Sequence, residues 1–220
     1  MKVVLSGYGK MGHMIEKVLA EKGIECPEKS ENIQSVPAEL AAESVCIDFT
    51  TPQAFRENYR FLADHFKAVV VGTTGWNDIK DEVIAYFREK GTTMIYASNF
   101  SIGVNVLFKA TELMSRLLKG QYEPYVLEMH HKHKLDAPSG TAKSLAAIVE
   151  ENMEQKPDVQ AVRCGEISGI HRIGFEGVCD RITIEHEAFS REGFARGAVE
   201  AALMTEQIHD VVEFKDLLHI

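Results

Sequence analysis

The stretch from Lys2 to Gly12 reads KVVLSGYGKMG, and it decides the fold. Residues 2–5 form a short run with high β-propensity, and glycines follow at positions 7, 9 and 12. Apolar residues then recur at the spacing of one helix face, at Met11, Met14, Ile15, Val18 and Leu19. The G-x-G-x-x-G pattern therefore stands where a strand passes into a helix.

Each glycine at such a junction has a physical reason. Gly7 makes the tight turn, Gly9 lets a pyrophosphate approach the backbone, and Gly12 lets the helix pack on the strand. The helix N-terminus then faces the phosphates. An ordinary glycine-rich turn would show the same residues, but the position directly after a first strand favours dinucleotide binding.

Three further strands are predicted, each followed by a polar loop. They cover residues 45–49, 68–71 and 93–97, and the loops read TTP from residue 50, GTTG from residue 72 and SNFS from residue 98. Helical patterns at residues 53–65 and 78–90 lie between the strands. This alternation predicts an α/β fold with a parallel sheet and right-handed crossovers. Ligands bind beyond the carboxyl ends of such strands, where these loops lie.

The residues that would grip the adenosine ribose are harder to find. Residues 23–37 lack a clear apolar second strand, and Pro27 interrupts them. Glu28 and Glu31 are candidates by position for the ribose hydroxyls, whereas Lys10 and Lys29 could neutralise a 2′-phosphate. Either NADH or NADPH is therefore compatible with the sequence.

Composition excludes several classes of function. The chain has 220 residues, 45% of them hydrophobic, and 33 acidic against 24 basic residues give a net charge of −9. This charge disfavours nucleic acid and anionic membrane as partners. No run approaches the ~18 apolar residues of a membrane span. The four scattered cysteines, with no signal-peptide pattern before them, predict reduced thiols in the cytoplasm.

A second segment rich in chemistry is EMHHKHKLDAPSGTA, residues 128–142. A strand over residues 121–129 is expected to end at His130 and His131. Pro138 and Gly140 break the chain before a helix over residues 142–152, which Ser139 or Thr141 can cap. The N–H groups of Gly140 and Thr141 would then be ready for a carboxylate.

A metal site is one interpretation of this segment and a solvated polar loop is another. Adjacent strand residues such as His130 and His131 face opposite ways, and two interleaved lysines oppose a divalent ion, so no metal is predicted. Histidine and a lysine near other cations suit proton transfer to an anionic substrate. Lys134, four residues after His130, is a sensible general acid.

Five blocks together resemble one family. In chain order they are GYGKMG, IDFTTP, VGTTGW, ASNFSIGVNVLF and EMHHKHKLDAPSGTA. They closely resemble the 4-hydroxy-tetrahydrodipicolinate (dihydrodipicolinate) reductase family of the lysine and diaminopimelate pathway. A later block, residues 163–171, matches the family's R-x-G-x-I-x-G-x-H, and residues 194–198 depart from its F-A-N-G-A by carrying Arg196.

The resemblance implies an NAD(P)H-dependent oxidoreductase, cytoplasmic and homotetrameric. It implies a Rossmann-type parallel sheet in residues 1–100 and 192–220. An inserted α+β domain in residues 101–191, built on an open mixed sheet, would bind substrate and join subunits. The substrate would be a cyclic imine dicarboxylate that receives a hydride at C4 of its ring and a proton at the neighbouring carbon.

The resemblance also implies roles for single residues. His130 and Lys134 would handle protons, with Lys134 as the acid, and His131, Ser139, Gly140 and Thr141 would hold the substrate. Cofactor contacts would come from Gly7, Tyr8, Gly9, Lys10, Met11, Gly12, Gly72, Thr73, Thr74, Ala97, Ser98, Asn99 and Phe100. Two rival interpretations are another Rossmann-type amino-acid dehydrogenase and a catalytically silent nucleotide-binding regulator. Neither accounts for HHKHKLDAPSGTA.

Overall fold

The chain divides into two compact units. The computed structural model describes residues 1–218; unit 1 comprises residues 1–101 and 192–218, and unit 2 comprises residues 102–191. Residues 219 and 220, which the predicted segment 192–220 includes, lie outside the described residues. No helix within residues 1–218 is long and apolar enough to cross a membrane.

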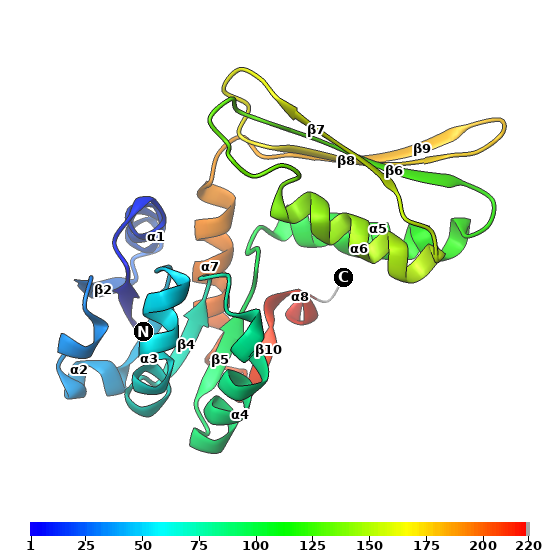
Figure 1. Ribbon diagram of the computed structural model, residues 1–220. Helices are drawn as coiled ribbons and strands as arrows, with labels where there is room; N and C mark the ends of the chain where they lie inside the picture. The colour runs from blue at the N-terminus through cyan, green and yellow to red at the C-terminus, as the bar shows by residue number, and fades with distance from the viewer. Residues whose placement is uncertain (219–220) are drawn as a thin grey trace. The chain divides into compact units, whose positions relative to one another are not determined.

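Unit 1 is built on a six-stranded, all-parallel sheet (Figure 1). The strands, in the spatial order β10-β5-β4-β3-β1-β2, are Val211–Glu213, Thr93–Tyr96, Ala68–Val71, Ser44–Asp48, Lys2–Ser6 and Glu25–Ser30. The helices are α1 (Lys10–Glu21), α2 (Ala38–Glu43), α3 (Pro52–His65), α4 (Lys80–Lys90), α7 (Glu192–Met204) and α8 (Phe214–Leu217). Two 3-10 turns, Ile33–Ser35 and Asn77–Ile79, complete the unit.

Two apolar layers hold this sheet between helices. Val3 and Leu5 of β1 pack with residues of α1 and α7, whereas Val4 packs with α3 and α4 on the opposite face. Strands buried on both faces read as continuous apolar runs, as β3 and β4 do here. The doubly wound α/β fold predicted from the first hundred residues is confirmed.

Residues 23–37, where the sequence shows no clear apolar second strand, do contain a strand. Residues 25–30 form β2 although they carry little apolar signal. The strand lies at the sheet edge and pairs only with β1, and its register slips between Lys2↔Glu25 and Val4↔Glu28. Pro27 falls within the slip, where a missing N–H costs no ladder hydrogen bond. Edge placement thus explains why the pattern was missed.

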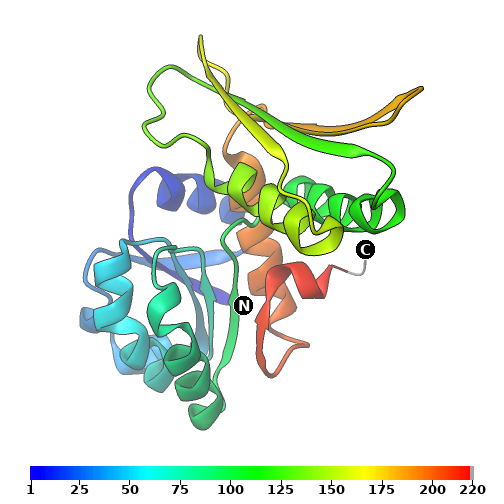
Figure 2. The same cartoon turned by 45° about the vertical axis from the view of Figure 1, so that its right-hand side comes forward.

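Unit 2 is an open four-stranded sheet with two helices on one face (Figure 2). In the order β7-β6-β8-β9 the strands are Asp158–Arg163, Glu123–His130, Ile170–Glu176 and Arg181–Glu187; only the β6–β7 pair is parallel. Helices α5 (Ile102–Leu118) and α6 (Gly140–Met153) bury Leu107, Leu145 and Val149 against Val126 and Ile173. This is the open mixed sheet that the family resemblance implies for this part of the chain.

Several expected boundaries move by a few residues. Strand β6 begins at Glu123, two residues after the expected start. Helix α6 begins at Gly140 rather than at residue 142, because the hydroxyl of Ser139 caps it by accepting a hydrogen bond from the N–H of Ala142. Helix α7 stops at Met204, and the N–H groups of Thr205 and Gln207 then donate to the carbonyls of Ala202 and Met204 in turns. None of these shifts changes which loops follow which strands.

Candidate active site

The glycine turn after β1 has a shape that only small residues allow. Gly7 adopts φ +86°, and a Cβ there would lie 2.6 Å from the carbonyl oxygen of Phe49. A Cβ on Gly12 would lie 2.6 Å from the carbonyl oxygen of Gly7, whereas one on Gly9 would meet nothing within 4 Å. Gly9 is also the N-cap of α1, and no side chain caps this helix start. Gly7 and Gly12 are therefore packed against neighbouring backbone, whereas Gly9 has open space beside it.

A buried carboxylate ties the loops around this turn together. Asp48, at the end of β3, has no exposed surface and accepts the hydroxyl groups of Ser6 at 2.7 Å and Thr50 at 3.1 Å. Thr73 donates to the same carboxylate and accepts the N–H of Thr50 at 2.7 Å. Burial raises the pKa of Asp48, while the three hydroxyls favour its ionised form. The loops after β1, β3 and β4 are thus fixed to one another.

The predicted cofactor residues lie at the carboxyl ends of β1, β4 and β5. Gly9, Lys10, Thr74 and Ser98 are exposed, and Gly7, Tyr8, Met11, Gly72 and Asn99 are half-buried. Gly12, Thr73, Ala97 and Phe100 are buried. The ring of Phe100 packs in the core, 5.0 Å from the ring centre of Phe214, so its side chain is not available to a ligand.

The charges beside the turn are arranged differently from expectation. Lys29, a candidate for a 2′-phosphate, places its Nζ 2.7 Å from the Glu16 carboxylate. Tyr8 donates its hydroxyl to the same carboxylate. The Lys29 ammonium lowers the pKa of Glu16. Glu16 was not among the candidates, because its partner on β2 is close only in space.

In unit 2 the histidine-rich loop connects β6 to α6. His130 ends β6 and is 8% exposed, and His131 is half-buried with its N–H donated to the Ile167 carbonyl at 2.7 Å. The Lys134 ammonium lies 2.8 Å from Asp136, which lowers the pKa of that carboxyl. Ser139 is buried, and Gly140 and Thr141 form the first turn of α6. The predicted proton donors and the helix N-terminus thus belong to one loop.

The cationic pocket expected of this loop is partly neutralised. Lys132 and His133 are exposed, and both lie near Glu166, at 3.6 Å and 3.5 Å. Within residues 1–218, no three His, Cys, Asp or Glu residues are grouped so that they could hold a metal ion. The Nδ1 of His131 is buried and has no hydrogen-bond partner among the described residues.

Two family models divide the chain between them. The model described as "Dihydrodipicolinate reductase, N-terminus" matches residues 1–100, and "Dihydrodipicolinate reductase, C-terminus" matches residues 103–218. The chain belongs to the dihydrodipicolinate reductase family.

Curated relatives and solved structures agree with this family. A 4-hydroxy-tetrahydrodipicolinate reductase from Christiangramia forsetii is 35% identical over 99% of this chain and 98% of its own length. One from Chromohalobacter salexigens is 38% identical over 78% of this chain and 71% of its own. A dipicolinate-bound dihydrodipicolinate reductase structure from Paenisporosarcina sp. has a TM-score of 0.83, at 22% identity and with 99% of each chain covered.

The rival Rossmann enzymes share the fold only at greater distance. An aspartate dehydrogenase from Thermotoga maritima has a TM-score of 0.54 at 12% identity.

Arg196, where the chain departs from the family's F-A-N-G-A pattern, lies at the surface. It pairs with Glu192 of α7 and with Glu21 of α1. This supports simple surface variation at that position of the dihydrodipicolinate reductase fold.

Sequence reasoning missed four polar residues of this family member. Asp48, Glu128 and His171 are buried, and Arg163 ion-pairs with Glu128. The alternation of buried and less buried residues along β6 could have identified Glu128. It places Glu128 on the same buried face as Val126, and a buried carboxylate needs a hydrogen-bonding or charged partner. Arg163 and His171 both belong to the R-x-G-x-I-x-G-x-H block, but nothing in the sequence indicates that they contact residues 128–139 in the folded protein.

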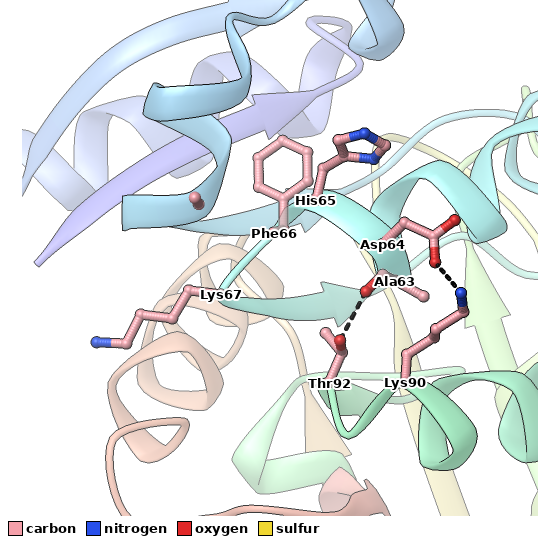
Figure 3. Close-up of a pocket in the computed structure, with 8 residues that line it drawn as sticks. Ala63, Asp64, His65, Phe66, Lys67, Lys90 and Thr92 are labelled. Atoms are coloured by element: carbon pink, nitrogen blue, oxygen red, sulfur yellow. Dashed lines mark hydrogen bonds and ion pairs between the residues drawn. The ribbon is translucent and has the colours of Figure 1, made fainter.

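A pocket of about 460 Å³ lies away from these loops, at the amino end of β4 (Figure 3). Its wall includes Phe66, Lys67 and the end of α3. Two interactions join residues of the wall: Lys90 pairs with Asp64 at 2.9 Å, and Thr92 donates to the Ala63 carbonyl at 2.6 Å. This pocket lies at the opposite end of β4 from the loop that begins at Gly72.

Proposed function

We propose that this protein reduces 4-hydroxy-tetrahydrodipicolinate (dihydrodipicolinate), a cyclic imine dicarboxylate, to tetrahydrodipicolinate with NADH or NADPH. The reaction belongs to lysine and diaminopimelate biosynthesis. The observation that carries the proposal is the whole-length similarity to a reductase of that name, which covers 99% of this chain and 98% of the relative. The inferred division of labour assigns the dinucleotide to unit 1 and the substrate to unit 2.

The glycine turn fits a dinucleotide. The open space at Gly9 admits a phosphate to the backbone, and the start of α1 offers N–H groups that no side chain caps. Gly7, Tyr8, Lys10, Met11 and Gly12 complete the turn, with Gly72 to Thr74 and Ala97 to Phe100 as neighbouring contacts. The Phe100 contact is limited to its backbone, because its ring is buried. A reduced nicotinamide supplies a hydride when bound.

The loop between β6 and α6 fits a dicarboxylate. The N–H groups of Gly140 and Thr141 and the dipole of α6 favour one carboxylate, and His131 and Ser139 would help to hold the substrate. The 4-hydroxyl first leaves as water, together with a proton from the neighbouring ring carbon. Hydride then adds at C4, and a proton returned to the neighbouring carbon neutralises the charge that this addition leaves. In the proposed reaction Lys134 gives that proton, and His130 assists proton transfer.

The test is a reductase assay of the purified chain with the imine substrate, run in parallel with NADH and NADPH. Oxidation of either cofactor that depends on the imine supports the proposal. An inactive chain that still binds dinucleotide would favour the silent regulator, and turnover of another amino-acid intermediate alone would favour a different dehydrogenase.

Replacement of Lys134 by alanine tests the acid. We expect Lys134→Ala to lower kcat roughly 100-fold or more while KM changes little, because a general acid acts in the transition state. Lys132→Ala is the matched control, since Lys132 is exposed in the same loop and has no assigned role. A variant at Lys134 with near-normal kcat and a raised KM would show a binding role instead.

We also propose a homotetramer in the cytoplasm, joined through unit 2. The sheet face opposite α5 and α6 carries cross-strand ion pairs such as Arg172 with Glu185, which suit a polar interface. Light scattering at micromolar concentration should give four times the monomer mass of 24.6 kDa. A monomeric mass with full activity would contradict this assembly.

A further inference from the structure

Strand β6 places an acid inside the sheet. Val126, Glu128 and His130 share the buried face of the strand, and Glu128 has no exposed surface at all. A buried carboxylate costs several kcal/mol unless it is fully paired, and apolar replacements are often at least as stable. A residue of this kind points to a role beyond stabilising the fold.

Two groups besides His130 hold the Glu128 carboxylate: the Arg163 guanidinium and the Ser139 N–H. Arg163 on β7 donates from Nη1 at 2.9 Å and from Nη2 at 2.6 Å, one to each oxygen. The N–H of Ser139 donates at 3.0 Å, and Arg163 also donates to the Asp136 carbonyl at 2.7 Å. Burial opposes ionisation, but these donors outweigh it and lower the pKa of Glu128. The carboxylate is therefore ionised and can only accept hydrogen bonds.

This state fixes the tautomer of the neighbouring imidazole. The Nδ1 of His130 lies within hydrogen-bond reach of Glu128 Oε2, so Nδ1 must carry the proton. Nε2 is then the nitrogen with the lone pair. A Cβ on Gly169 would lie 3.0 Å from this atom, so the glycine leaves Nε2 uncovered by a side chain.

Burial and nearby positive charges lower the pKa of His130 and so favour its neutral form. Burial lowers the pKa of His130, and Lys134 of the loop and Arg163 of β7 lower it further. Glu128 raises the pKa in opposition, and its charge would stabilise the imidazolium once formed. His171 of β8 faces His130 with ring centres 5.0 Å apart and adds a second neutral imidazole.

We propose that Glu128, clamped by Arg163, is a positioning residue that fixes His130 with its proton on Nδ1 and its lone pair on Nε2. In a catalytic cycle Nε2 takes a proton, and the imidazolium is paired with Glu128 until Nε2 gives the proton back. This role rests on the proposed function, because it needs His130 to handle a proton. Glu128 touches no reacting atom.

The tautomer can be read directly by nitrogen NMR on the full ¹⁵N-labelled chain. The His130 signals are identified by their loss in His130→Asn. We expect a protonated Nδ1 and an unprotonated Nε2 in the wild type at neutral pH. We expect Glu128→Gln to shift the ring toward the Nε2-protonated form. A wild-type ring with unprotonated Nδ1 would overturn the proposal, and this result does not depend on whether Glu128→Gln folds.

Kinetics separate positioning from structural support. Glu128→Gln should lower kcat roughly 100-fold with KM little changed, and the limb of the pH profile governed by His130 should move to lower pH. Glu154→Gln is the matched control, since Glu154 pairs with Lys119 at 2.7 Å at the exposed end of α6 in the same unit and should change neither readout.

The outcomes distinguish this role from the proposed function. A wild type without reductase activity but with Nδ1-protonated His130 refutes the reductase and supports the tautomer assignment. A wild type with reductase activity whose Glu128→Gln variant keeps full kcat and an unmoved pH limb refutes the positioning role alone.

Discussion

The three glycines of the G-x-G-x-x-G motif are needed for different physical reasons. Gly7 and Gly12 are needed for packing of the backbone, whereas Gly9 faces open space and is needed only if a ligand approaches it. The G-x-G-x-x-G spacing predicted this turn because each glycine has its own steric reason. The same reasoning could not find Glu128, since its partners Arg163 and Ser139 are distant in sequence and meet only after β6 and β7 pair.

Two alanine substitutions separate folding from cofactor binding. Gly12→Ala should destabilise unit 1 by about 1–3 kcal/mol, because the new methyl group would lie 2.6 Å from the Gly7 carbonyl oxygen. Gly9→Ala should cost less than about 1 kcal/mol yet weaken dinucleotide binding about tenfold. Thermal unfolding and fluorescence titration with NADH and NADPH measure the two effects. Equal affinity of Gly9→Ala and the wild type would place the dinucleotide elsewhere.

Elements with strong periodicity were predicted well, and the edge strand was not. Strand β4 and helix α3 follow apolar patterns that burial on the sheet dictates, so residues 68–71 matched and α3 began one residue early at Pro52. Strand β2 has alternating exposure and a slip at Pro27, and hydrogen bonds to β1 form it rather than hydrophobic burial. A strand of this kind can be identified only once its neighbour β1 is in place, and not from its own sequence.

The buried histidine of β8 makes the stability of unit 2 depend on pH. Burial, with His130 nearby, lowers the pKa of His171 to about 4, against about 6.5 in an unfolded chain. The unfolded state therefore binds more protons between these pH values. Stability is intact above about pH 6.5 and falls as the pH drops toward 4, by up to ~3 kcal/mol from this residue.

Substitution of His171 tests this pH dependence. His171→Gln can still accept the Ser139 hydroxyl bond, which is 3.0 Å long, and it has no proton to bind. Thermal unfolding at pH 7 and pH 5 should show a smaller loss of Tm for His171→Gln than for the wild type. An equal loss in both proteins would mean that another group governs the acid limb.

At the scale of the whole molecule, two units have separate cores. The apolar clusters around β1 and β4 draw only on residues of unit 1, and the cluster around Val126 and Phe175 draws only on unit 2. The α/β alternation of the sequence predicted the sheet of unit 1, whereas the family resemblance implied the mixed sheet of unit 2. Independent cores imply that the units need not unfold together.

The single tryptophan allows the two unfolding events to be told apart. Trp76 is buried in unit 1, so its fluorescence reports that unit alone. Saturating NADPH or NADH should raise the Trp76 midpoint by a few degrees, since a ligand at 100 times its Kd stabilises by about 2.7 kcal/mol. The histidine NMR signals of unit 2 should show a separate midpoint. Coincident midpoints with and without cofactor would contradict two independent units.

The central claim is that this chain transfers a hydride to the ring of a cyclic imine dicarboxylate. The most direct measurement uses NADH or NADPH deuterated at the transferable position, with mass spectrometry and NMR of the tetrahydrodipicolinate formed. The account predicts one deuterium per product molecule, at C4 of the ring, in the wild type, and a greatly reduced yield with Lys134→Ala. Product without deuterium, or deuterium at another carbon, would contradict it.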